Sequence, residues 1–364
     1  MPPSSSGGFT TCLTTSTRRW RASSSRRWGS RSTPCPKSRS ATCRPGKRAR
    51  DGDGVHALLP DPPPGGGREL TIFGPARRTW VLGGGGARGA AQVGVLQALF
   101  EAGLEPPVAL VGVSVGALNG SCIAAYPSQA GVMMLRELWM SRQALEVFHA
   151  HPLGVILSGL RRGQMSALPQ DNVRRLVERA QALTGITTFE QMRLPLAIVA
   201  TDLNAGKPAV FRAGLLTPAL LASTAIPGVF PSVRIDGREH MDGGIVDNTP
   251  LDIAINDGAK EILAISLMAG GENEQAPVTW PELIARTLQL SLHHQMLSDY
   301  ERLRERARIT VLCPITAPTA TWEMKRDHID SVVESSRVAT AAMLAQKGSR
   351  FMRHSGIQYL ELRG

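Results

Sequence analysis

Short apolar runs alternate with longer stretches of helical periodicity from residue 78 onward. Runs of this length between polar turns are typical of buried strands, and five of them occupy residues 78–82, 108–113, 194–200, 262–267 and 309–312. Apolar residues at helical spacing lie between the runs at residues 90–102, 173–183 and 283–303, and we expect a last helix within 322–348. This alternation predicts an α/β protein of three α/β/α layers, in which helices cover both faces of a mainly parallel central sheet.

The positive charge of the chain is concentrated in its N-terminal part. Residues 1–78 hold 15 of the 41 Lys and Arg residues and 4 of the 30 Asp and Glu residues, so the rest of the chain holds 26 of each. A neutral body argues against a nucleic-acid partner, because a DNA-binding domain gathers positive charge on one face. Aromatic residues make up only 5% of the chain, which disfavours a stacking platform for single strands.

Residues 1–78 are rich in Ser, Arg and Pro and have no apolar periodicity. We expect a disordered tail and linker here, because such a composition buries too little apolar surface to fold. An organellar transit peptide and sequence upstream of the true start remain open as alternatives. No apolar segment resembles a secretory signal, and polar residues interrupt the uncharged run 106–135, so we expect no transmembrane helix. Cys122 and Cys313 stand apart in the body, and together these features favour a cytoplasmic location.

The pentapeptide at residues 112–116, Gly-Val-Ser-Val-Gly, stands where a predicted strand meets a predicted helix. A nucleophile elbow needs this context, since Gly112 and Gly116 allow a sharp turn that exposes the hydroxyl of Ser114. The alternative is that Ser114 is only the N-cap of the helix. The pentapeptide alone leaves both interpretations open.

A second glycine-rich turn, residues 83–89, follows the first predicted strand. Its Gly84, Gly86 and Gly89 fit the G-x-G-x-x-G pattern of dinucleotide-binding folds. The acidic residue that such folds carry at the end of the second strand is missing, because that strand leads into Ser114 instead. Next to a nucleophile, the same loop would direct backbone N–H groups at a developing oxyanion. Arg88 would support the loop or add positive charge.

The candidate base is Asp242, which precedes Gly243 and Gly244 in a tight turn from which its carboxylate can reach Ser114. The loop GGGARG, the elbow GVSVG and the turn DGG, in this order, resemble the patatin-like phospholipase family. The phrases ATDLNAGKPAVF and ASTAIPGVFPSV also resemble its bacterial members, and the resemblance covers about residues 80–267.

The resemblance implies a patatin-like fold and a serine lipid acyl hydrolase that works through a Ser-Asp dyad and an acyl-enzyme. By residue, it implies Ser114 as nucleophile, Asp242 as base, and an oxyanion loop made by Gly84, Gly85 and Gly86 with Arg88. It implies a lipid or other acyl-ester substrate, such as a phospholipid or lysophospholipid, and no cofactor or metal. Transient contact with a membrane surface is a hypothesis from the substrate class, and the oligomeric state is left open.

The resemblance and the charge pattern divide the chain into three parts. We expect the tail and linker at 1–78, a patatin-like catalytic domain at 79–270, and a C-terminal helical extension with one further strand at 271–364, packed on the catalytic domain.

Several other side chains are candidates for a catalytic role. A Ser-His-Asp triad would use His240 or a later histidine, but the chain order of such triads argues against it. Turn formation and capping explain Asp202, Asp247 and Asn248. The bulky residues 133–140 are expected to fill core, and the apolar segment 152–160 is either a buried element or a lid at a bilayer surface.

Two other classes of function compete with the hydrolase. The first is a lipid-binding regulatory protein that retains the pocket and rarely turns over. The second is a nicotinamide-dependent oxidoreductase, which the missing acidic residue disfavours.

Overall fold

The computed structural model describes residues 78–148, 168–269, 279–315 and 326–362, which all belong to one compact unit, residues 67–364. The expected tail at 1–77 and the apolar segment 152–160 lie outside the described residues.

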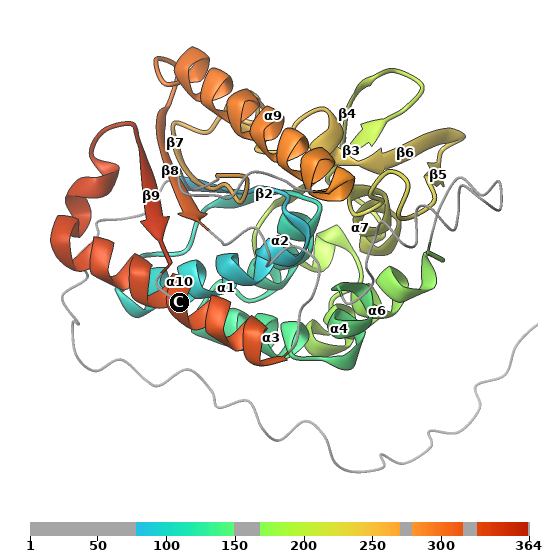
Figure 1. The fold of residues 1–364 in the computed structure, drawn as a ribbon, viewed down its shortest axis with the longest axis horizontal. Helices are drawn as coiled ribbons and strands as arrows, with labels where there is room; N and C mark the ends of the chain where they lie inside the picture. Colours follow the sequence, from blue (N-terminus) through green and yellow to red (C-terminus); the bar gives the residue numbers. More distant parts are fainter. Residues whose placement is uncertain (1–77, 149–167, 270–278, 316–325, 363–364) are drawn as a thin grey trace, which may run out of the picture. The chain divides into compact units, whose positions relative to one another are not determined.

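The centre of this unit is a nine-stranded sheet whose inner strands are parallel (Figure 1). The parallel strands adjoin in the order β3, β2, β1, β7, β8, β9, with bounds Leu196–Asp202, Ala109–Val113, Arg78–Leu82, Glu261–Ile265, Arg308–Ile315 and Gly356–Glu361. Antiparallel strands complete it beyond β3, namely β4 (Lys207–Phe211), β5 (Val233–Ile235) and β6 (Arg238–Asp242). The expected mainly parallel sheet is confirmed.

Helices cover both faces of the sheet, so the architecture is the predicted three-layer α/β/α arrangement. Alternate strand residues feed two separate cores: Trp80 and Leu82 belong to one, and Val81 to the other. The first core is completed by α1 (Gly89–Glu101), α2 (Val115–Ala125), α3 (Gln129–Trp139), α6 (Asp171–Thr184), α7 (Leu216–Ser223) and α10 (Arg326–Lys347). The second is completed by α8 (Leu251–Asn256) and α9 (Trp280–Leu303), while the short α4 (Arg142–Phe148) follows α3.

Strand β3 joins the parallel and antiparallel parts of the sheet. Along one edge it pairs with β4 over residues 198–202. Along the other edge, β2 pairs with β3 as far as Val199, and β6 pairs with it from Ala200 onward. Since β2 and β6 run in opposite directions, they point at each other end to end along β3. The residue that follows β2 therefore meets the residue that ends β6.

The C-terminal part of the chain continues the sheet, which corrects the expectation of an extension with one further strand. It supplies two strands, β8 and β9, and only β8 is mainly apolar and buried along most of its length. Strand β9 (GIQYLE) lies at the edge of the sheet and is only partly buried, so its sequence carries little apolar signal.

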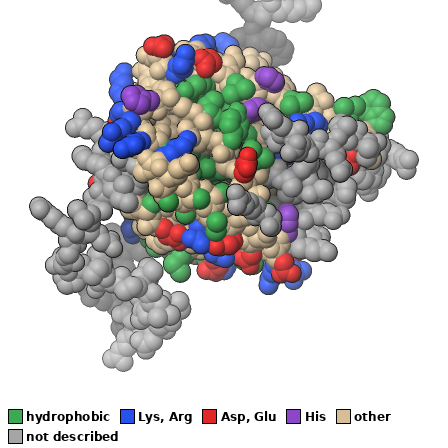
Figure 2. All heavy atoms as spheres, turned by 60° about the vertical axis from the view of Figure 1, so that its left-hand side comes forward, with side chains coloured by type: hydrophobic (Ala, Val, Ile, Leu, Met, Phe, Trp, Pro, Cys, Tyr) green, Lys and Arg blue, Asp and Glu red, His purple; other side chains and the backbone are tan. Residues whose placement is uncertain are grey.

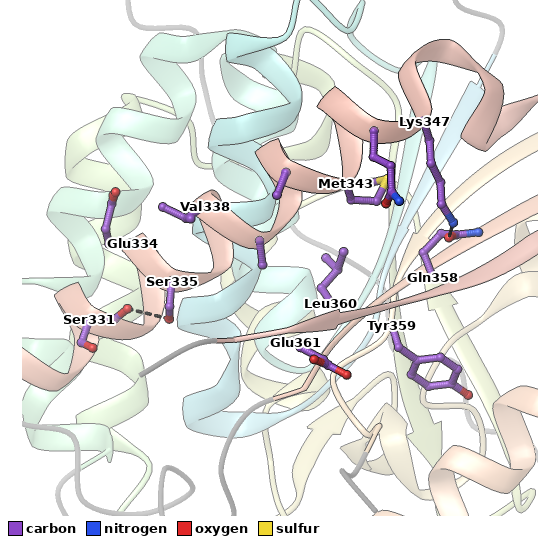
Figure 3. Close-up of a pocket in the computed structure, with 13 residues that line it drawn as sticks. Ser331, Glu334, Ser335, Val338, Met343, Lys347, Gln358, Tyr359, Leu360 and Glu361 are labelled. Atoms are coloured by element: carbon purple, nitrogen blue, oxygen red, sulfur yellow. Dashed lines mark hydrogen bonds between the residues drawn. The ribbon is translucent and has the colours of Figure 1, made fainter.

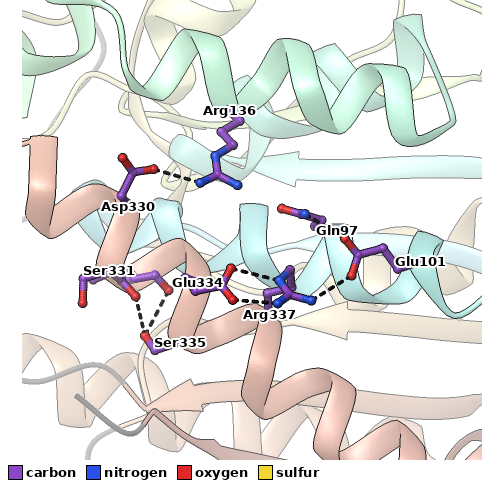
Figure 4. A network of polar contacts seen from close by, with 9 residues as sticks. Gln97, Glu101, Arg136, Asp330, Ser331, Glu334, Ser335 and Arg337 are labelled. Atoms are coloured by element: carbon purple, nitrogen blue, oxygen red, sulfur yellow. Dashed lines mark hydrogen bonds and ion pairs between the residues drawn. The ribbon is translucent and has the colours of Figure 1, made fainter.

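Helix α10 is held against α1 and α3 by close backbone packing and by ion pairs (Figure 4). A Cβ atom at Gly94 would lie 2.0 Å from the carbonyl oxygen of Val333, so only glycine allows this approach. Arg337 bonds Glu101 of α1 at 3.1 Å, and Arg136 of α3 bonds Asp330 at 3.0 Å. These half-exposed pairs fix the orientation of α10 more than they add stability.

An open groove of about 660 Å³ separates α10 from β9 (Figure 3). Its apolar residues include Val338, Met343 and Leu360, while Glu334 and Lys347 lie among its polar ones. None of its lining residues belongs to the glycine loop, the elbow or the Asp242 turn.

The uncharged run 106–135 forms β2, α2 and the start of α3, as a buried strand and helix were expected to do. Among the helices of the described ranges, none has the combination of length and apolar character that crossing a membrane requires. Lys and Arg side chains share the face seen in Figure 2 with Asp and Glu, in keeping with a body of balanced charge.

Candidate active site

Ser114 occupies a strained turn between β2 and α2. Its backbone φ is +53°, a value that non-glycine residues rarely adopt. The turn is tight because a Cβ atom at Gly112 would lie 2.6 Å from the Cα of Ala117, and one at Gly116 would lie 2.1 Å from the carbonyl oxygen of Leu82. The two glycines of the pentapeptide are thus explained by close backbone contacts.

The side chain of Ser114 is hydrogen-bonded to Asp242. Its Oγ donates a 2.6 Å hydrogen bond to Oδ2 of the carboxylate, and it makes no capping bond to the first turn of α2. The end-to-end arrangement of β2 and β6 explains the contact, since Ser114 follows the last residue of β2 and Asp242 ends β6. The hydrogen bond favours the nucleophile interpretation over the N-cap interpretation.

Asp242 is buried and oriented by the turn that follows it. Its Oδ1 accepts a 2.8 Å hydrogen bond from the backbone N–H of Gly244. Burial raises the pKa of Asp242 to about 6, although the bonds from Ser114 and Gly244 act in the opposite direction. A Cβ atom at Gly243 would lie 2.4 Å from the carbonyl oxygen of Val199, which explains that glycine. A carboxylate with a pKa near neutrality can take and return a proton at physiological pH.

The glycine loop lies beside the serine. A Cβ atom at Gly84 would lie 3.2 Å from the Cβ of Ser114 and 2.6 Å from Oδ1 of Asn248, so a side chain there would meet both. The N–H of Gly84 donates to the backbone oxygen of Asn248 at 3.2 Å, and the Asn248 amide donates to the Gly84 oxygen at 3.3 Å. Within the described residues, the N–H groups of Gly85 and Gly86 have no hydrogen-bond acceptor. Of the three expected oxyanion donors, Gly84 is therefore already engaged.

Arg88 is buried rather than exposed at the mouth of the site. Its backbone N–H donates to the Gly85 oxygen at 3.1 Å, and its Nη1 lies 3.7 Å from Sδ of Met268. These contacts tie both ends of the residue to the surroundings of the glycine loop, which fits a supporting role.

His240 of β6 has contacts other than the serine. The His240 ring is buried, with Nδ1 3.1 Å from the Arg238 oxygen and its centroid 5.5 Å from the ring of Phe211. His293 lies on α9, where Nε2 is 3.4 Å from the hydroxyl of Tyr359. Neither histidine bonds Ser114 or Asp242 in the part of the chain described.

Asp202 and Asn248 differ in their surroundings. Asp202 accepts backbone hydrogen bonds from Asn204 and Ala205 and pairs with Arg238. Asn248, by contrast, joins the Asp242 turn to the glycine loop, a link that its position in the sequence did not indicate.

Three buried polar residues near the site escaped the sequence analysis: Gln92, Asn119 and Ser223. Each interrupts an otherwise apolar helical segment. A polar residue on the buried face of a helix needs a partner, and this was the available signal.

No three His, Cys, Asp or Glu side chains within the described ranges gather as a metal site requires.

Comparisons with known proteins identify the class. The model of the patatin-like phospholipase family matches residues 80–255. An uncharacterised NTE family protein of Mycobacterium tuberculosis is 34% identical over 208 residues, which are 57% of this chain and 53% of that protein. Human patatin-like phospholipase domain-containing protein 6 is 33% identical over 197 residues, 53% of this chain and 14% of that protein. Residues 80–255 thus form a patatin-like phospholipase domain.

The chain spans about half the length of the mycobacterial relatives it matches, at 53%. Among solved structures, the chain is similar to VipD from Legionella pneumophila, with 15% sequence identity and a TM-score of 0.43. The match covers 75% of this chain and 67% of the VipD chain.

Proposed function

We propose that this protein is a serine lipid acyl hydrolase that cleaves carboxylic ester bonds through a dyad of Ser114 and Asp242. The observation that carries the proposal is the 2.6 Å hydrogen bond from the strained serine to the buried carboxylate. The family match and the names of the relatives, which include phospholipase domain-containing proteins, support lipid esters as the substrate class.

The carboxylate must do the work that histidine does in a triad. The pKa of free Asp lies about 2.6 units below that of His, so an exposed Asp would be a poor base. A pKa of about 6 for Asp242 removes most of this disadvantage. The proton can therefore move from Ser114 Oγ to Asp242 Oδ2 as Oγ attacks the ester carbonyl carbon.

The rest of the cycle follows from the same groups. The N–H groups of Gly85 and Gly86 would stabilise the oxyanion of the tetrahedral intermediate. Asp242 would then return its proton to the leaving alcohol, which gives the acyl-enzyme. In the second half, Asp242 would take a proton from water as the water attacks the acyl carbon, and Ser114 Oγ would recover a proton when the acid leaves. A lipid substrate held in a bilayer would also require transient contact with the membrane surface.

The test is hydrolysis of p-nitrophenyl esters by the full chain, together with labelling by a fluorophosphonate. Wild type is expected to turn over and to label. Ser114→Ala should do neither, and Asp242→Asn should lose at least about a thousandfold in kcat. His240→Gln is the matched control, because His240 is a buried titratable side chain on the same strand, two residues from Asp242.

Two results would contradict the proposal. If His240→Gln lost as much activity as Asp242→Asn with the fold intact, the dyad would be replaced by a histidine-containing site. If folded wild type neither turned over esters nor labelled, the lipid-binding regulatory protein would become the leading interpretation.

A further inference from the structure

The glycine loop cannot fix its own shape. Residues 83–86 are four glycines, so no side chain of theirs can anchor the backbone, and Gly86 has φ of +56°. A glycine backbone loses more conformational freedom on ordering than any other. Oxyanion donors act only if they are held in place before the reaction. The shape of this loop must therefore come from its neighbours.

One support enters from the helices beneath the loop. Nε2 of Gln92 on α1 donates to the Gly83 oxygen at 2.9 Å, where the loop begins. Nδ2 of Asn119 on α2 donates to the Gly89 oxygen at 3.1 Å, where the loop ends. Gln92 and Asn119, the buried amide pair, thus hold the loop at both ends.

The buried amide pair is itself fixed. Nδ2 of Asn119 also donates to Oε1 of Gln92 at 2.9 Å, and Oδ1 of Asn119 accepts from Nε1 of Trp139 on α3 at 3.0 Å. This chain of bonds sets which end of each amide donates. The chain of hydrogen bonds from Trp139 through Asn119 and Gln92 to the loop therefore defines one arrangement of the two amides.

Burying two amide side chains brings little gain in stability, so their presence needs another explanation. Gln92 and Asn119 are both 0% exposed, within helices whose other buried residues are apolar except for Ser121. Burying an amide gains little over an apolar side chain of the same shape, even when all its bonds are made. Neither residue contacts Ser114 or Asp242 by a hydrogen bond in the described structure, and both direct a donor at a loop carbonyl.

We propose that Gln92 and Asn119 are positioning residues, which preset the glycine loop so that the N–H groups of Gly85 and Gly86 face the oxyanion. The inference rests on the proposed hydrolase function. Loss of the pair lets the loop move relative to Ser114, and a displacement of about 1 Å can cost about 100-fold in rate. Since the oxyanion forms only during reaction, the loss falls on kcat rather than on KM.

The experiment compares Gln92→Met, Asn119→Leu and the double variant in the full chain, because both substitutions keep side-chain size and remove the hydrogen bonds. Each single variant is expected to lower kcat by about 10- to 100-fold with KM within about twofold. The double variant should lose little more than either single one, because the two amides act on one loop. Thr340→Val is the matched control: it removes a buried hydroxyl of α10 whose hydrogen bond, among the described residues, goes to the Ser336 oxygen.

Hydrogen exchange gives a second readout that does not depend on activity. The peptide covering residues 83–89 should exchange faster in Gln92→Met, while peptides from β7 and β8 keep their wild-type rates. If Asn119→Leu fails to fold, Trp139→Phe replaces it, because that variant removes the indole N–H that donates to Asn119 and keeps an aromatic ring at this position.

Three outcomes overturn the proposal. They are kcat values within about twofold of wild type, a loss of kcat no larger than in Thr340→Val at equal loss of stability, and unchanged exchange at residues 83–89. Failure of the proposed function is distinguishable, since wild type itself would then neither turn over nor label.

Discussion

The backbone N–H of Ser114 donates a 2.8 Å hydrogen bond to Oγ of Ser223, and the same hydroxyl donates at 2.6 Å to the oxygen of Val199. Ser223 is fully buried at the end of α7. Val199 lies on β3 opposite Val113, the residue before the nucleophile. A single hydroxyl therefore ties the strained turn to the strand that places Asp242.

Replacing this hydroxyl should affect both stability and rate. Ser223→Ala leaves the Ser114 N–H and the Val199 oxygen without this partner, so we expect about 1–3 kcal/mol less free energy of unfolding. We also expect kcat to fall by about tenfold or more, because the turn that aims Ser114 is loosened. Urea unfolding and ester hydrolysis measure the two effects.

Ser336→Ala is the control for Ser223→Ala. Ser336 is equally buried, but in the part of the chain that the structure describes its hydroxyl donates to the Val332 oxygen within α10. Equal losses in the two variants would show that Ser223 has no special relation to the nucleophile.

Activity should depend on the ionisation of Asp242. Since burial raises its pKa to about 6, kcat/KM should be constant above this pH and fall about tenfold per pH unit below it. The raised pKa also means that protonating Asp242 stabilises the fold, fully below its unfolded value and less as the pH rises through 6. Loss of activity between pH 6 and 5 is therefore not unfolding caused by this group. A profile that stays flat down to pH 5, recorded with a soluble ester, would exclude Asp242 as the base.

Asp247 should lower stability at neutral and alkaline pH. Burial, together with Asp252 and Asp299, raises its pKa to about 9, so the folded chain keeps a proton there that the unfolded chain releases near pH 4. Its contribution to stability is complete in acid and is lost as the pH rises from about 4 to 9. Asp247→Asn keeps the shape and a donor for Asp252, so it should raise the melting temperature at pH 8.

The melting temperature of Asp247→Asn at pH 8 is expected to rise by a few degrees, at about 2–4 °C per kcal/mol of stability recovered. Near pH 4 we expect no rise. Thermal unfolding at both pH values tests this. An equal gain at the two pH values would mean that the substitution acts through packing and not through the proton.

Two glycines of α2 should respond differently to alanine. A Cβ atom at Gly116 would lie 2.1 Å from a backbone oxygen that cannot yield, so Gly116→Ala should cost well over 2 kcal/mol or abolish folding. At Gly120 the nearest atoms are side-chain carbons at 3.6 Å, so Gly120→Ala should be neutral or stabilise by about 0.5–1 kcal/mol. Melting temperatures compare the pair, and similar effects would contradict the close contact at Gly116.

The sequence sufficed for the inner strands and the outer helices because both leave strong apolar patterns. It also singled out Ser114 and Asp242, since tight turns need glycines at fixed positions. It missed β9, whose residues are mostly half-buried or exposed and form no apolar run. It also missed the links through Ser223 and the buried amide pair, because these depend on which segments far apart in the chain become neighbours.

The glycine loop shows the same limit at the level of single atoms. Gly84, Gly85 and Gly86 are equivalent in the sequence. In the structure, the backbone oxygen of Asn248 accepts a hydrogen bond from the N–H of Gly84 and none from the N–H groups of Gly85 and Gly86. This distinction follows from the Asp242 turn lying against the glycine loop, which no local pattern encodes.

The pairing of β6 with β3 makes the position of Asp242 beside Ser114 depend on strand register. Only three residues of β6 pair with β3, and side chains alternate between the two faces of a strand. A slip by one residue would offer Met241 or Gly243 to Ser114 in place of the carboxylate. The hairpin turn at Asp236 and Gly237, both with positive φ, sets the register of β5 against β6. The turn therefore fixes the register within the β5–β6 hairpin, and the three pairs between β6 and β3 fix which side chain of that hairpin lies next to Ser114.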